Sequence, residues 1–223
     1  MAINESKIIR ILDENGPDSH GSAALYVLRE EFRKSKTSEV MSFLTAECVR
    51  PPVLWNDVST LVWDDSAADK NRFPFLQGDV IRTTLVKRPG HSELSVENSL
   101  WLVCSPTCDA VRARFIRVAP LFRVVTDAED SDAKSKLKIA CSLASSKRFA
   151  IPRFPDDTEN VSGYYADFEE PFFVTREDAD QAVPLRTLTM RGWHLFSMIV
   201  LDGETRANPE EEEKIRSFRL EGT

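Results

Sequence analysis

Residues 78–125, which read GDVIRTTLVKRPGHSELSVENSLWLVCSPTCDAVRARFIRVAPLFRVV, form the most distinctive stretch of this chain. The stretch holds runs rich in β-branched, aromatic and other apolar residues at 78–86, 100–105, 111–118 and 121–125. Residues of these types favour strands, and the Gly, Pro, Asn and Asp residues between the runs favour turns. We therefore predict a strand at each run, with Ala119-Pro120 as the break between the last two. Short strands at this spacing indicate a barrel or a sandwich, not a parallel βαβ fold.

Helical patterns flank this stretch on both sides. Apolar residues recur at helical spacing in residues 5–15, in a segment that starts at Ser22, in a segment after Thr37, in residues 132–145 and in residues 190–202. Further strand-forming runs lie at 53–63, 148–151 and 171–174. Because strands outnumber helices in the middle of the chain and helices lie at its ends, the predicted class is α+β.

The composition is that of an ordinary globular protein. In 223 residues, 42% are hydrophobic and 29% are charged, which is enough apolar material for a core without disulfide or metal support. The net charge of −7 argues against a general nucleic-acid coat protein, which would carry the opposite sign.

No secretory signal and no membrane-spanning run is predicted from the apolar segments of this sequence. Residues 1–10 hold no apolar run behind positive charge, and the apolar run 195–201 is far too short to span a bilayer. The four cysteines do not form the pattern of a disulfide framework: Cys48, Cys104, Cys108 and Cys141. We therefore expect a cytoplasmic protein with no membrane partner.

The order of pieces within residues 78–125 resembles the MazF/PemK-type toxin family. Gly78-Asp79-Val80 opens a strand, a charged loop follows, an apolar strand ends at Ser105, and the next strand runs into a turn at Pro120. The resemblance implies a small SH3-like β-barrel. It also implies RNA cleavage by an Arg-Pro arginine before the second strand and a Ser or Thr at its end. Ser105 matches the latter, but residues 98–100 read Asn-Ser-Leu, so the cation that would stabilise the developing phosphorane charge is absent there.

The predicted fold is therefore a small SH3-like, mostly antiparallel β-barrel with an N-terminal helical segment and a C-terminal helix. The predicted domain organisation is a helical N-terminal segment at 1–50, the barrel domain with an inserted helix at 51–206, and an acidic C-terminal tail at 207–223.

A nucleophile could lie directly after the second of these strands, where the candidates are Ser105, Cys108 and Asp109. A catalytic cysteine needs a neighbouring base that lowers its pKa, and the chain has three histidines: His20, His91 and His194. His91 could approach Cys108 across the barrel. The alternative is a capped turn in which Cys108 is a small buried hydrophobe. We therefore predict no catalytic residue, no metal ligand and no cofactor.

Basic residues give the clearest binding signal. Between Asp79 and Val125 the chain carries seven basic residues against four acidic ones, so this segment is locally +3. Arg112 and Arg114 would point to the same side of a strand, and with Arg82 they are the predicted binding residues for phosphate or carboxylate groups. The alternative is a solvated strand face paired with acids such as Glu169 and Glu170.

The function that we predict is non-catalytic binding by an adaptor with a protein partner. The family resemblance implies a bacterial or phage multi-protein system of the toxin–antitoxin, regulatory or phage-defence type. One alternative is a divergent MazF/PemK-like endoribonuclease whose cation comes from Arg112 or Arg114. Another is a nucleic-acid-binding regulator, because the helix, Asn15-Gly16-Pro17 and second helix at the start are similar to the opening of winged-helix domains. The densest aromatic cluster, residues 164–173, is expected to be mostly core, with some rings lining a groove.

Overall fold

The computed structural model describes residues 3–15, 21–52, 75–88, 99–105, 114–127, 130–169 and 172–200. The chain divides into two compact units, each assembled from separate stretches of sequence. Unit 1 comprises Met1–Val49, Leu121–Glu169 and Arg191–Glu204. Unit 2 comprises Arg50–Pro120, Glu170–Met190 and Thr205–Thr223. The short strand β1 (Val49–Arg50) and the long strand β4 (Phe115–Val125) therefore contribute residues to both units.

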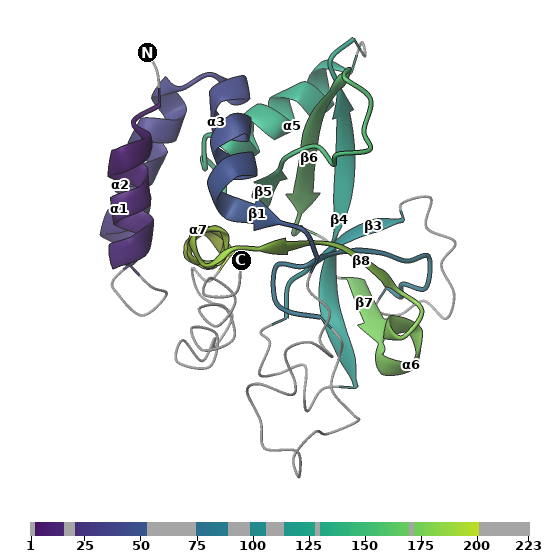
Figure 1. Ribbon diagram of the computed structural model, residues 1–223. Coiled ribbons are helices and arrows are strands. Elements are labelled where there is room, and N and C mark those ends of the chain that lie inside the picture. The colour runs from purple at the N-terminus through teal and green to yellow at the C-terminus, as the bar shows by residue number, and fades with distance from the viewer. Residues whose placement is uncertain are drawn as a thin grey trace. The chain divides into compact units, whose positions relative to one another are not determined.

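Unit 1 combines helices with a short antiparallel sheet (Figure 1). Its helices are α1 (Glu5–Glu14), α2 (Gly21–Lys34), α3 (Thr37–Phe43), the π-helix η1 (Leu44–Cys48), α5 (Ser131–Cys141) and α7 (Met190–Val200). The sheet has the order β4-β6-β5, with β6 at Val161–Asp167 and β5 at Arg148–Ile151. Helices α1 and α2 lie side by side (Figure 1).

Local sequence explains where these helices begin and end. Asn4 caps α1, since its side chain accepts a hydrogen bond from the Lys7 N–H at 3.1 Å. Asp130 caps α5 in the same way and accepts from two backbone N–H groups at 3.0 Å each. After α5, Leu143 has a positive φ of 53°, a conformation that is incompatible with continuing a right-handed helix.

The core of unit 1 is built from the apolar faces of its helices and the inner side of its sheet. Phe32 and Phe43 pack edge to face with ring centroids 5.9 Å apart, and Phe149 and Phe196 do so at 5.3 Å. All of these rings are buried. Cys48 of η1 lies against Gly192 of α7, so segments more than a hundred residues apart in sequence meet within this unit.

Unit 2 is an antiparallel sheet with one short helix. It contains β2 (Val80–Arg82), β3 (Leu100–Val103), the first part of β4, β7 (Phe172–Thr175), β8 (Val183–Leu188) and α6 (Arg176–Ala179). The order is β8-β2-β3-β4, and β7 pairs with β4 on its other side. Its buried cluster comprises Phe75, Ile81, Val86, Trp101, Val103, Ile116, Val118, Phe172, Val174 and Ala179.

The predicted α+β class is confirmed, with antiparallel pairing, helices at the N-terminus and the helix α7 near the C-terminus. The helix predictions at 5–15, 132–145 and 190–202 match α1, α5 and α7 within a few residues at each end. The predicted strand at 53–63 and the tail at 207–223 lie outside the described residues.

The predicted break at Ala119-Pro120 is wrong, because β4 runs unbroken from Phe115 to Val125. Pro120 lies between the residues of β4 that pair with β7, which end at Val118, and those that pair with β6, which begin at Leu121. Pro120 pairs with Trp101 of β3 at a position where its nitrogen faces the opposite side of β4, and no described strand is paired with it on that side. Its missing N–H therefore costs no ladder hydrogen bond, and the strand continues through it.

The structure adds three strands that the pattern did not predict: β1, β6 and β8. Residues 161–167 do not alternate between apolar and polar side chains, because both faces of β6 are largely buried. Gly163 within the strand weakens the strand pattern further. Strand β8 contains Pro184, and a proline weighs against a strand assignment.

Candidate functional site

The Gly78-Asp79 pair that opens the family-like stretch forms a buried turn in unit 2. The Asp79 carboxylate accepts from the Leu76 N–H at 2.8 Å, and the Asp79 N–H donates to the Leu76 carbonyl at 3.0 Å. Gly78 has a φ of +83° and donates its N–H to the Val103 carbonyl at 2.8 Å. Gln77 and Asp79 are at most 1% exposed. These polar residues therefore hold the backbone of the turn in place rather than facing a ligand.

Ser105, the first candidate nucleophile, anchors the end of the second strand of the motif. Its hydroxyl accepts a hydrogen bond from the Arg117 N–H at 2.8 Å, and its own N–H donates to the Arg117 carbonyl at 3.3 Å. The side chain is half-buried. The other two candidates, Cys108 and Asp109, lie outside the described residues.

The described cysteines are buried free thiols with raised pKa values. Burial raises the pKa of Cys104 and of Cys141 to about 12, and it raises the pKa of Cys48 further still. His194, the described histidine, places its Nδ1 2.6 Å from the carbonyl oxygen of Leu12. Within the described ranges, then, no thiol has the lowered pKa that a nucleophile requires.

Thiol titration tests this arrangement. At pH 8 the pKa values of about 12 leave almost no thiolate at Cys104 and Cys141, and burial denies reagent access to Cys48 as well. We expect Ellman's reagent to find no fast-reacting thiol in a Cys108→Ser variant until guanidinium unfolds it, when three thiols react. A fast native reaction in that variant would contradict the burial of these side chains.

The predicted binding arginines do not all come together. Arg82 and Arg114 are both exposed. Ile81 of β2 pairs with Trp101 of β3, which pairs in turn with Pro120 of β4, and Arg82 lies one residue beyond Ile81. Arg114 lies six residues before Pro120, in the opposite direction along the sheet. At about 3.3 Å per residue they are on the order of 20 Å apart along the strand direction. Arg112 lies outside the described residues, so its pairing with Arg114 stays a prediction.

The acidic partner considered for these arginines is engaged elsewhere. Glu169 pairs with Lys147 at 3.1 Å and with Arg148 at 3.6 Å, and the hydrogen bond from Lys147 lowers the pKa of this carboxylate. Glu170 lies outside the described residues.

Two aromatic rings, one exposed and one half-buried, lie on the outer face of β4 and β7. Because side chains alternate along a strand, Ile116 and Val174 point into the core of unit 2 while Phe115 and Phe173 point outward. The two rings meet edge to face with centroids 4.9 Å apart, and Phe115 is 51% exposed. We call this feature the β4–β7 aromatic pair. Phe173 belongs to the predicted aromatic cluster, whereas no local pattern predicted that Phe115 would contact it.

That cluster otherwise behaves as predicted. Tyr164, Tyr165 and Phe172 are buried, while Phe168 and Phe173 are half-buried. The expectation that most of these rings belong to the core is therefore confirmed.

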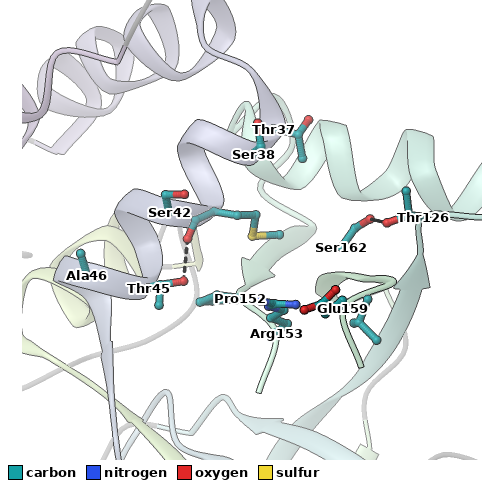
Figure 2. Close-up of a pocket in the computed structure, with 12 residues that line it drawn as sticks. Thr37, Ser38, Ser42, Thr45, Ala46, Thr126, Pro152, Arg153, Glu159 and Ser162 are labelled. Atoms are coloured by element: carbon teal, nitrogen blue, oxygen red, sulfur yellow. Dashed lines mark hydrogen bonds between the residues drawn. The ribbon is translucent and has the colours of Figure 1, made fainter. Parts of the chain in front are cut away.

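Unit 1 carries a pocket of about 770 Å³ between α3–η1 and the ends of its strands (Figure 2). One wall is the polar side of the helical segment, and the opposite wall is formed by residues after β4, after β5 and at the start of β6. It is lined by Thr37, Ser38, Met41, Ser42, Thr45, Ala46, Thr126, Pro152, Arg153, Glu159, Val161 and Ser162. The sequence analysis missed this pocket, because its walls come from segments more than eighty residues apart.

The described part of the chain shows neither a cluster of metal ligands nor a helix that could span a membrane. No three His, Cys, Asp or Glu side chains within it are grouped so that they could hold a metal ion. None of its helices has the length and apolar character needed to cross a membrane. A scan against protein-family models and a search of curated proteins found no match to this sequence.

Proposed function

We propose that this protein is a non-catalytic adaptor that binds a protein partner through the β4–β7 aromatic pair. The observation that carries the proposal is the contact of the exposed ring of Phe115 with the half-buried ring of Phe173, on the face of the sheet opposite its buried cluster. Single exposed apolar side chains are common on protein surfaces. Two aromatic rings in contact offer a rigid apolar area whose burial contributes strongly to a protein interface.

Side chains rather than backbone groups would make this interface. Strand β7 has no open edge at Phe173, because its N–H and carbonyl each bond to Lys87 at 2.8 Å on the side away from β4. A partner strand could not extend the sheet there, so recognition falls to the rings and the residues around them.

The charge around the pair favours a protein partner over RNA. Arg114, next to Phe115, is exposed, and arginine beside aromatic rings is typical of protein interfaces. Lys87 is already paired with Asp178 at 3.4 Å, which reduces the positive charge available to phosphates. Strong RNA binding needs several such cations, and the chain as a whole carries −7.

The engagement of Ser105 also supports binding rather than catalysis. A serine whose oxygen accepts from the Arg117 N–H is held as part of the strand end. Among the described residues, no acceptor takes its hydroxyl hydrogen, so a direct cleavage assay is the appropriate check. The family resemblance motivates a search for the partner in bacterial or phage multi-protein systems.

Partner binding tests the proposal. The tagged full-length chain is cross-linked in its native cells, the partner is identified and purified, and its Kd is measured. We expect Phe115→Ala with Phe173→Ala to weaken binding by about 10- to 30-fold, as loss of a buried aromatic anchor does. The control is Phe122→Ala, because Phe122 is 41% exposed and stacks on Tyr165 in unit 1. An unchanged Kd in the double variant would overturn the proposed surface.

A parallel assay separates the alternatives. Labelled single-stranded RNA and duplex DNA are incubated with the wild type, Ser105→Ala and Arg114→Ala at low and moderate salt. RNA cleavage that disappears in Ser105→Ala would replace the adaptor by an endoribonuclease. Salt-sensitive binding without cleavage, weakened in Arg114→Ala, would replace it by a nucleic-acid-binding regulator.

A further inference from the structure

The pocket of unit 1 combines an apolar floor with a polar rim. Met41, Pro152 and Val161 are buried and form the apolar part of the lining. Ser38 and Ser42 lie on one wall and belong to the polar side of α3, whose opposite side is buried in the core. Figure 2 shows the hydroxyl of Ser42 on the helix and those of Thr126 and Ser162 across the pocket.

The rim can donate and accept hydrogen bonds at the same time. The Thr45 hydroxyl donates to the Met41 carbonyl at 2.8 Å, which leaves its oxygen as an acceptor. Thr126 and Ser162 lie 2.9 Å apart, so one hydroxyl donates to the other and the pair retains one hydrogen to donate. The Ser42 hydroxyl makes no hydrogen bond to any residue that the structure describes. Such a rim matches a ligand whose own groups are both donors and acceptors.

The charges at the rim balance. Arg153 and Glu159 both line the pocket and are exposed. The nearby Asp157 carboxylate is held inside the fold, where it accepts from the Tyr164 hydroxyl at 2.8 Å and from the Phe154 N–H at 2.7 Å. Among the lining residues the charge of Arg153 is matched by that of Glu159, so no net positive charge favours phosphate or another anion. A neutral ligand with many hydroxyl groups leaves no charge unmatched.

From these features we infer that the pocket of unit 1 binds a polyhydroxylated sugar ring. The C–H face of the ring would cover Met41, Pro152 and Val161, while its hydroxyl groups would bond to the serine and threonine rim and to Glu159. A volume of about 770 Å³ accommodates one or two sugar rings with water. The ring could belong to a free saccharide or to the ribose of a nucleoside, and both contain the same chemistry.

The helix geometry at the rim is independent support. The α-helix α3 turns into the π-helix η1 at Leu44, and two lining residues, Thr45 and Ala46, lie in this π-helical segment. Single π-helical turns occur frequently at functional sites, where the widened turn re-aims side chains. Here the widened turn carries the Thr45 side chain on the wall of the pocket.

Saturation-transfer NMR on the full chain tests the inference. Glucose, maltose, N-acetylglucosamine and adenosine are each added at millimolar concentration, the range in which a small pocket first shows binding. We expect ring C–H protons of at least one saccharide to receive saturation. Saturation transfer to adenosine that includes its ribose protons would assign the ring to a nucleoside. No transfer to any of these four compounds would overturn the inference.

Two variants locate the binding site. Ser42→Phe places a ring inside the pocket from an exposed position, and Ser135→Phe makes the same change on the exposed side of α5, away from the lining residues. Saturation should vanish in Ser42→Phe and persist in Ser135→Phe. Glu159→Ala, on an exposed loop residue, should weaken binding about tenfold without an effect on folding. Binding that is unchanged in both Ser42→Phe and Glu159→Ala would place the sugar elsewhere and overturn the inference.

Discussion

Replacing Gly192 with alanine is expected to lower the free energy of unfolding by about 2–3 kcal/mol, although glycine-to-alanine changes inside helices usually stabilise by about 1 kcal/mol. Gly192 lies in α7, and a Cβ atom at this position would meet the carbonyl oxygen of Cys48 at only 2.0 Å and its carbonyl carbon at 2.8 Å. Both atoms belong to backbone, so no side chain can rotate away. Either α7 or the end of η1 has to move.

Thermal unfolding followed by circular dichroism measures this effect. A loss of about 2–3 kcal/mol corresponds to a Tm lowered by roughly 5–10 °C in a chain of this size. Ser135→Ala on the exposed side of α5 is the matched control and should stay within about 0.5 kcal/mol of the wild type. A stabilised Gly192→Ala variant would show that α7 does not approach Cys48 this closely.

The same substitution connects the fold of unit 1 to its pocket. Cys48 ends the π-helix η1, and Thr45 in that segment lines the pocket. A shift of η1 that accommodates a new methyl group would therefore move one wall. If the pocket binds a sugar ring, Gly192→Ala should weaken that binding as well as the fold, whereas Ser135→Ala should change neither.

The second large effect is expected in unit 2, where Trp101→Ala should destabilise the fold by about 3–5 kcal/mol. Trp101 is fully buried and packs against Phe172 with ring centroids 5.1 Å apart. Its indole N–H donates to the Thr83 carbonyl at 2.9 Å, so the truncation leaves a cavity and also removes the partner of a buried carbonyl. Such a loss is a large fraction of the stability of a typical domain.

Denaturant unfolding followed by circular dichroism is the suitable measurement, because the variant loses a fluorescent side chain. Trp101→Phe separates the two contributions: it retains much of the ring volume but cannot donate to Thr83, and should cost about 1–3 kcal/mol. Val183→Ala is the surface control, since Val183 is 52% exposed. A Trp101→Ala variant as stable as this control would contradict the packing of the unit 2 core.

Local sequence pattern was sufficient for most elements of this fold. The apolar faces of α1, α3, α5 and α7 follow helical spacing, and each of these helices lies where that spacing predicts it. Strands β3 and β5 lie within their predicted runs for a similar reason, because β-branched and aromatic residues are concentrated there. Helix and strand formation of this kind depends on residues close in sequence.

The failures occurred where the environment of a segment overrides its pattern. Pro120 indicates a break, yet β4 continues through it because its neighbour on one side changes from β7 to β6 at that position. Strand β6 is buried on both faces and so lacks alternation, and its Gly163 has a φ of +142° with Met41 close above it. Neither fact can be read from the residues of the segment itself.

The candidate sites show the same division more sharply. The residue pattern was enough to predict that a strand follows Gly78-Asp79, that another ends close to Ser105 and that the middle of the chain is locally basic. It could not show that Asp79 and Ser105 are occupied by backbone hydrogen bonds, or that Arg82 and Arg114 lie far apart along the sheet.

Which distant segments form one unit became clear from their three-dimensional packing. It brings residues 37–46 of the N-terminal helices against residues 126–162 to make a pocket, and it sets Phe115 beside Phe173 across two strands. The physical reason is that strand register and helix packing are determined by the fit of many buried side chains at once. A periodic pattern states which face of a segment is buried, but not which other segment covers it.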